Sequence, residues 1–311
     1  PTKPLYSVQD ENGEVALCTL SAVNLGALES LDELEDITEI IVRSLDCLLD
    51  YQDYPLKSAE ITSNNRRTLG IGVTNLAYYL AKNDAKYSDG SGNELIHKTF
   101  EALQFYSLKA SNKLAIEFGA CPLFSETQYA QGILPVDSYK KDIDVFCNTK
   151  LELDWDSLRK DIKASGLRNS TLTALMPCES SSQISNSTNG IEPPRGFVSV
   201  KQSKDGILKQ VVPEYEKLHK KYELLWDIKD NEGYLQLCAI MQKFVDQSIS
   251  TNTHYDPSKF EGNRVPMKLF LMDLLKAYKY GIKTLYYHTT RDGASDDQNT
   301  TKPSDDDCED G

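Results

Sequence analysis

A run of hydroxyl side chains follows an apolar segment near the middle of the chain. Residues 172–177 have the composition of a β-strand, and the next segment, 178–183, contains three consecutive serines. A strand that leads into a serine-rich helix start can bind an anion, because N–H groups, the helix dipole and hydroxyls converge there. We therefore expect a phosphate to fit on residues 179–182. The alternative interpretation is that the serines only cap a helix.

Cysteines are the second set of residues that could carry chemistry. Their odd number and wide spacing suit neither a secreted disulfide scaffold nor a zinc site, so no metal centre is expected. By pattern alone most of them, including Cys18 at the end of the strand-like run 14–20, are small buried residues. Cys308 differs, because it lies among acidic residues that offer nothing to bury it. The seven are Cys18, Cys47, Cys121, Cys147, Cys178, Cys238 and Cys308.

Two pairs of adjacent tyrosines stand in different contexts. Tyr286 and Tyr287 fall in the strand-like run 282–288, where neighbouring side chains alternate between the two faces of a strand. We expect one ring to point inward and the other outward, with packing as the ordinary role. Tyr78 and Tyr79 lie on a helical pattern and are expected to pack in the core.

The elements that must position these residues alternate between helical and extended patterns. Strands separated by helices indicate an α/β architecture, and periodicity leaves open whether the sheet is open or closed into a barrel. The helical segments are 28–49, 97–118, 155–165, 208–225, 234–249 and 266–280, and the strand-like runs are 170–176, 196–200 and 282–288.

Gly70 and Gly72 punctuate an extended piece that runs into a helical pattern between residues 68 and 80. The element lacks the third glycine of a dinucleotide-binding fingerprint, so that function is disfavoured. The glycines are expected to permit a close turn from strand to helix.

Composition limits the class of protein and its partners. With 311 residues, of which 40% are hydrophobic, the chain can bury one sizeable core or two modest ones. The net charge of -13 argues against a nucleic-acid partner, because proteins that bind phosphodiester backbones carry a basic excess. No apolar run approaches the ~20 residues of a membrane span, and the first residues have no signal-peptide core. We expect a cytoplasmic protein with no membrane partner.

The C-terminal segment differs from the rest of the chain. Residues 295–311 carry seven acids against one lysine and almost nothing to bury, which predicts a disordered acidic tail. No repeat or low-complexity linker precedes it, so residues 1–294 are expected to form one unit.

Several motifs closely resemble the class I ribonucleotide reductase large, catalytic subunit. The sequence Leu-Arg-Asn-Ser-Thr-Leu at 167–172 and Thr-Asn-Gly-Ile-Glu-Pro-Pro-Arg-Gly at 188–196 belong to one such stretch, together with 174–177 and 183–186. The resemblance spans nearly the whole chain. It implies the C-terminal half of that family's ten-stranded α/β barrel. Further similar blocks follow in the family's order at 16–22, 24–26, 66–72, 246–249, 283–287 and 290–293.

The resemblance implies a substrate site on the hydroxyl-rich turn. In that family the stretch after the strand binds the phosphates of a ribonucleoside diphosphate through backbone amides and hydroxyls. By this similarity Pro177, Glu179, Ser180 and Ser181 would contact the substrate's phosphates. The implied position agrees with the anion site expected from the N–H groups, the dipole and the hydroxyls at the start of this helix.

The resemblance also implies redox roles for four residues. Cys18 would be one of two cysteines that reduce the ribose, its partner lying upstream. Tyr286 and Tyr287 would pass an oxidising equivalent from a metal-containing, radical-generating small subunit, since a phenol can release a proton and an electron together. Cys308 would belong to a tail pair that thioredoxin or glutaredoxin reduces by thiol exchange. The second cysteine of the pair does not occur before Gly311.

One family element is missing from the sequence. The family's radical cysteine sits in an Asn-x-Cys-x-Glu motif, and no cysteine here has that context. Because the first residue is Pro1 rather than Met, we expect a downstream piece, from a split gene, processing or a partial sequence. A separate N-terminal fragment would complete the barrel and cover its exposed strand edge. Two alternatives remain: an inactive phosphate-binding or assembly module, and another phosphate-dependent enzyme that uses Cys178 and Glu179.

Overall fold

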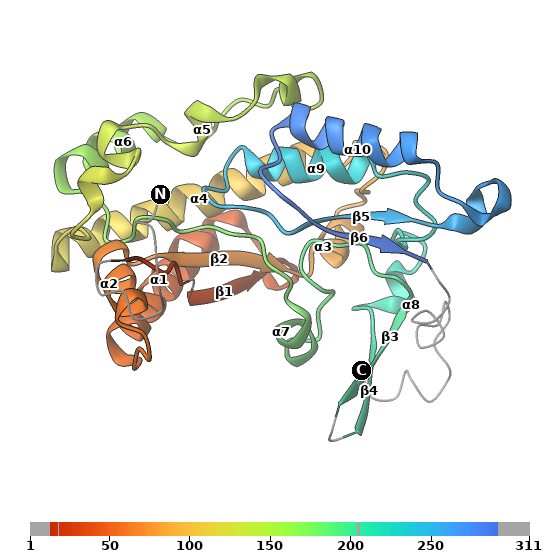
Figure 1. The fold of residues 1–311 in the computed structure, drawn as a ribbon, viewed down its shortest axis with the longest axis horizontal. Coiled ribbons are helices and arrows are strands. Elements are labelled where there is room, and N and C mark those ends of the chain that lie inside the picture. Colours follow the sequence, from red (N-terminus) through yellow and green to blue (C-terminus); the bar gives the residue numbers. More distant parts are fainter. Residues whose placement is uncertain (1–12, 18, 204–205, 292–311) are drawn as a thin grey trace.

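The computed structural model describes residues 13–17, 19–203 and 206–291. Its secondary structure alternates between helices and short strands, in agreement with the expected α/β class (Figure 1). The strands are β1 Thr19–Asn24, β2 Leu69–Thr74, β3 Val198–Ser203, β4 Gly206–Val211, β5 Thr251–Tyr255 and β6 Leu285–Thr290. The α-helices are α1 Leu34–Tyr51, α2 Lys57–Arg66, α3 Leu76–Lys82, α4 Asn93–Phe118, α5 Pro135–Ser138, α6 Trp155–Ser165, α7 Glu179–Ile184, α8 Tyr215–Leu218, α9 Glu232–Gln242 and α10 Met267–Tyr280.

Five parallel segments form a continuous hydrogen-bonded ladder. β1 pairs with β2 in parallel, and β5 pairs with β6 in parallel. Two extended segments join these pairs, because Ile71 of β2 bridges to Thr173 and Leu175 bridges to Ile249. The order across the ladder is therefore β1, β2, residues 171–175, residues 247–255 and β6. The strand-like run expected at 170–176 is the middle of this ladder.

Asp246 and Gln247 tie the middle of the ladder together. The Asp246 carboxylate accepts hydrogen bonds from the backbone N–H groups of Leu172 (2.8 Å) and Thr173 (2.9 Å). The Gln247 side-chain amide donates to the carbonyl oxygens of Leu69 (2.6 Å) and Thr173 (3.2 Å). Two adjacent side chains thus bind backbone groups on two neighbouring segments, in addition to the backbone hydrogen bonds between the segments themselves.

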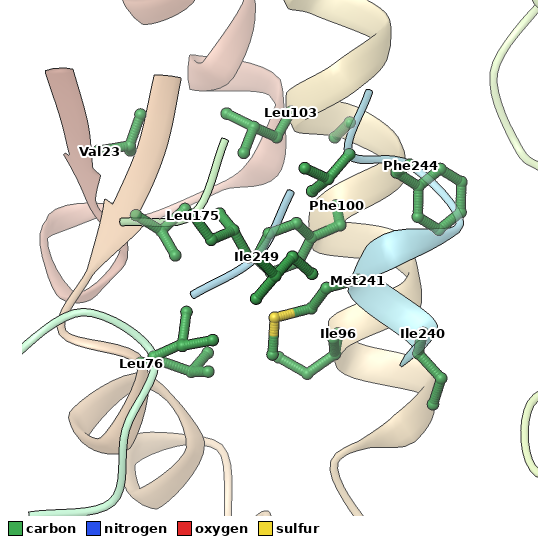
Figure 2. Packing of buried hydrophobic residues seen from close by; sticks show 14 of the residues in the cluster. Val23, Leu76, Ile96, Phe100, Leu103, Leu175, Ile240, Met241, Phe244 and Ile249 are labelled. Carbon is green, nitrogen blue, oxygen red and sulfur yellow. The ribbon is translucent and has the colours of Figure 1, made fainter. Parts of the chain in front are cut away.

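The hydrophobic core lies between this ladder and the helices that cover it. α4 supplies Ile96, Phe100 and Leu103, and α9 and the residues just after it supply Met241 and Phe244 (Figure 2). Figure 2 shows Leu175 and Ile249 of the ladder pointing toward these helices. All of these side chains are at most 3% exposed, so the ladder is anchored from the side that the helices cover.

Gly72 has a packing role that differs from the expected one. It lies inside β2, and a methyl group at its position would come within 2.7 Å of the Ala174 carbonyl oxygen and the Met176 sulfur. The residue therefore permits the close approach of the neighbouring segment. The turn into α3 is made by Asn75, whose φ is 69°.

Two of the expected helices are wrong in part. The helix expected at 208–225 is instead the strand β4, which pairs antiparallel with β3, followed by the short helix α8. Pro213 and the β-branched pair before it favour this interpretation, because proline cannot continue a helix that contains residue 212. The helix expected at 234–249 ends at Gln242, and residues 247–250 are extended because they pair with residues 173–175.

Helices long and apolar enough to traverse a bilayer are absent from the part of the chain that the structure describes.

Replacing Asp246 with asparagine tests the role of its carboxylate in the ladder. The amide nitrogen of asparagine would face one of the two backbone donors and leave it unsatisfied, which costs about 1–3 kcal/mol. We expect the free energy of unfolding, measured with urea, to fall by that amount. The matched control is Asp36→Asn on the exposed face of α1, which should change it by less than about 0.5 kcal/mol. Equal effects of the two substitutions would contradict the assigned role.

Candidate functional site

A cavity of about 480 Å³ lies between the start of α7, the β3–β4 hairpin and β6. α7 and the hairpin extend to the same side of the ladder (Figure 1). Gln210 of β4 holds the two together, since its side-chain amide donates to the carbonyl oxygens of Ser182 (3.3 Å) and Ser187 (3.1 Å). The cavity is thus enclosed by segments that are far apart in the sequence.

The hydroxyl-rich turn forms one wall of the cavity. Pro177 and Glu179 line it, whereas Ser180 and Ser181 are exposed on the same turn and are not among its lining residues. The hydroxyl of Ser181 donates to the Cys178 carbonyl oxygen at 3.2 Å. Because the N–H groups of a first helical turn precede the helix's own hydrogen-bond ladder, the backbone is the part of this turn best suited to an anion.

Tyr286 and Tyr287 form another wall, and their rings lie against each other. The ring centroids are 4.0 Å apart with 46° between the planes. Both side chains line the cavity, and the two residues are 49% and 57% exposed. The expectation that one ring points inward and the other outward is wrong. The hydrogen bond with Tyr287 raises the pKa of the Tyr286 phenol above its ordinary value.

An irregularity in the strand pairing explains why both rings share a face. Thr251 of β5 pairs with Leu285 of β6, and the next recorded pair joins Thr253 to His288. One residue of β5, Asn252, therefore stands opposite both tyrosines. An extra residue in one strand forms a β-bulge, which interrupts the alternation of side chains. The bulge places two consecutive tyrosines on the cavity side.

The charged groups of the cavity are Glu179, Glu192 and Arg195 among its described lining residues. Burial raises the pKa of Glu192, while Asn252 and Arg195 oppose that change. His254 lies behind Glu192, with its Nε2 3.9 Å from a carboxylate oxygen. Burial, followed by the charge of Arg195, lowers the pKa of His254 to about 4. The histidine is therefore neutral at pH 7.

Most of the cysteines in the described residues are buried, as expected. Cys121, Cys147, Cys178 and Cys238 are buried and Cys47 is exposed. Burial raises the pKa of Cys121 to about 11 and that of Cys238 to about 12, so both remain thiols at neutral pH. Tyr78 and Tyr79 are also buried, as expected.

Two of the expected redox residues lie outside the described residues. These are Cys18 and Cys308, and the expected tail at 295–311 lies there as well. Within the described part, no group of three or more His, Cys, Asp or Glu side chains could hold a metal ion.

Four further residues line the cavity that the sequence motifs did not indicate as functional: Asn252, Glu192, Arg195 and Thr289. Glu192 and Arg195 belong to the Ile-Glu-Pro-Pro-Arg stretch that carried part of the resemblance. For Asn252 the only signal was an amide side chain between two threonines in the run 251–255.

Comparison with known proteins places the chain in a family. The family model described as ribonucleotide reductase, barrel domain, matches residues 5–288. The chain belongs to this family.

Similar proteins are named as alpha subunits of ribonucleoside-diphosphate reductase. The chain is 67% identical over 298 residues to "Ribonucleoside-diphosphate reductase subunit alpha" of Haemophilus influenzae, covering 96% of the chain and 39% of that protein. It is 66% identical over 265 residues to "Ribonucleoside-diphosphate reductase 1 subunit alpha" of Escherichia coli, covering 85% and 35% respectively. It is 49% identical over 310 residues to the alpha subunit of Enterobacteria phage T4, covering 98% and 41%. The chain thus spans about two fifths of the length of these relatives.

Differences in cysteine burial predict an order of alkylation. With iodoacetamide at pH 7.5, Cys47 should be modified in the folded protein, whereas Cys121 and Cys238 should react only after denaturation. The reason is that the thiolate is the reactive form, and burial removes both access and thiolate. Peptide mass spectrometry gives the extent at each position. Modification of Cys238 in native protein as fast as that of Cys47 would contradict the assigned burial.

Proposed function

We propose that the chain is part of the catalytic subunit of a ribonucleoside-diphosphate reductase. In this proposal it contributes the substrate's phosphate site and a pair of redox tyrosines, and it works with the remainder of the catalytic subunit and a small radical-generating subunit. The observation that carries the proposal is the shared cavity, which is lined by Pro177 and Glu179 on one side and by Tyr286 and Tyr287 on the other.

The reaction replaces the ribose 2′-hydroxyl with hydrogen. Two thiols supply the electrons, so that they become a disulfide while the hydroxyl leaves as water. Cys18 is proposed as one of these thiols, and its partner and the radical cysteine belong to the remainder of the subunit. Cys308 is proposed to take part in re-reduction by thioredoxin or glutaredoxin through thiol–disulfide exchange.

The tyrosine pair is proposed to carry the oxidising equivalent into the cavity. A phenol that loses an electron also loses its proton readily, and a neighbouring phenol can accept or supply that proton through a hydrogen bond. Contact between the rings, whose centroids are 4.0 Å apart, suits such an exchange. The metal that generates the radical belongs to the small subunit in this proposal.

The ladder is proposed to be one half of a ten-stranded barrel. Within the described residues, β1 pairs only with β2 and β6 pairs only with β5, so the ladder has two outer edges. Leu20 of β1 is 50% exposed. Edge strands of this kind are normally covered, and the other half of the catalytic subunit would cover them.

Substitution of Tyr287 by phenylalanine tests the proposed function. The change keeps the ring and removes the O–H, so the complete reductase complex should lose turnover by at least ~10²-fold, the scale of a catalysed proton transfer. Tyr51→Phe is the matched control, because Tyr51 is 87% exposed on α1. Turnover of the Tyr287 variant near the wild-type rate would refute the proposed role. A wild-type complex that assembles with both partners but never turns over would support an assembly module instead.

A binding measurement tests the phosphate site separately. A ribonucleoside diphosphate should bind the complex at least about tenfold more tightly than the corresponding ribonucleoside, because a charged group gains hydrogen bonds of about 1.5–3 kcal/mol. Ser181→Ala should change this preference little, since that hydroxyl already donates to a backbone carbonyl. Equilibrium dialysis with both ligands gives the ratio. Equal affinity for the two ligands would refute a phosphate site on this turn.

A further inference from the structure

The β-bulge leaves a backbone N–H group that a side chain satisfies. Where β6 carries its extra residue, the N–H of Tyr287 donates to the side-chain oxygen of Asn252 at 2.9 Å. Asn252 is 8% exposed, so this bond is largely shielded from water. The side chain of Asn252 thus stands in for a ladder hydrogen bond at the position where the two tyrosines share a face.

The other end of the same side chain contacts Glu192, which also lines the cavity. The Asn252 side-chain nitrogen donates to the Glu192 carboxylate. The assignment of oxygen and nitrogen follows from the two partners, because a flipped amide would oppose two donors at Tyr287 and two acceptors at Glu192. Asn252 therefore joins the tyrosine strand to the segment that contains Glu192.

That segment leads directly to the hydroxyl-rich turn. The backbone N–H of Glu192 donates to the carbonyl oxygen of Asn189 at 3.3 Å. The side-chain oxygen of Asn189 accepts the backbone N–H of Cys178, the residue before α7, at 3.0 Å. A series of hydrogen bonds thus runs from the start of α7 through Asn189, Glu192 and Asn252 to Tyr287.

We propose that Asn252 is a positioning residue, which holds Tyr286 and Tyr287 in contact and fixes them relative to the phosphate turn through Glu192. This inference rests on the proposed function, because the contact matters for turnover only if the tyrosines carry the oxidising equivalent. Asn252 acts through Tyr287 and Glu192, to which its side chain is hydrogen-bonded.

Few side chains could replace Asn252 and still make both of its hydrogen bonds, one as acceptor and one as donor. Leucine has nearly the same shape but leaves the N–H of Tyr287 and the carboxylate of Glu192 without their partner. Aspartate keeps an acceptor for Tyr287 but places a second carboxylate against Glu192, and like charges at this separation repel. Glutamine at position 192 could then donate to that aspartate and restore the link.

The test compares variants within the complete reductase complex. Asn252→Leu and Asn252→Asp should each lower kcat by about tenfold or more, the effect of breaking a buried hydrogen bond to a charged group. Glu192→Gln alone keeps an oxygen that can accept from Asn252, and its kcat is the reference against which the double variant is compared. The double variant Asn252→Asp with Glu192→Gln should recover most of the loss. Asn148→Asp, at an exposed position, is the control for added charge.

Failure of this inference can be distinguished from failure of the proposed function. If Tyr287→Phe abolishes turnover while both Asn252 variants turn over like the wild type, the positioning role is overturned and the proposed function stands. If Tyr287→Phe retains turnover, the proposed function itself fails. If the double variant stays as slow as Asn252→Asp, the link through Glu192 is overturned.

A spectroscopic readout separates positioning from general loss of structure. With 3-fluorotyrosine at position 286, the ¹⁹F signal reports the titration of that phenol. Asn252→Leu should lower the pKa of this group, because the hydrogen bond with Tyr287 that raises it would be lost. An unchanged titration in a correctly folded variant would overturn the proposal.

Discussion

The parallel ladder depends on hydrogen bonds made by two adjacent side chains in its middle. The Asp246 carboxylate and the Gln247 amide bind backbone groups of Leu69, Leu172 and Thr173, beside the backbone hydrogen bonds that join the same segments. Because a buried backbone group without a partner is costly, these side chains reinforce the order in which the segments are neighbours. The order of the segments in turn places α7 and β6 around one cavity.

The site also requires a local departure from regular strand geometry. In an unbroken strand Tyr286 and Tyr287 would face opposite sides, and only one of them could line the cavity. The extra residue in β6 brings both rings to one side, and their centroids are 4.0 Å apart. The bulge is held by Asn252, whose side chain also donates to Glu192, another residue that lines the cavity.

The α/β class, the middle strand near residues 170–176 and most long helices could be predicted from hydrophobic periodicity. The helical spacing of the segment 208–225 was misleading, because it does not encode the pairing of β4 with β3. The local signal against a helix was Pro213 with the two valines before it. Helical spacing was also misleading for residues 247–250, which are extended only because they pair with residues 173–175. The serine-rich turn could be predicted as an anion site, because hydroxyls and N–H groups converge at a helix start. Asn252 could not be predicted, because its role depends on a β-bulge that the sequence of one strand does not reveal.

We propose that one cavity holds both the substrate's diphosphate and the tyrosine pair. A crystal structure of the reductase complex with a bound ribonucleoside diphosphate tests this most directly. We expect the diphosphate to lie against the backbone at the start of α7, with the sugar in the cavity that Tyr286 and Tyr287 line. A diphosphate bound elsewhere, with this cavity filled only by water, would contradict it.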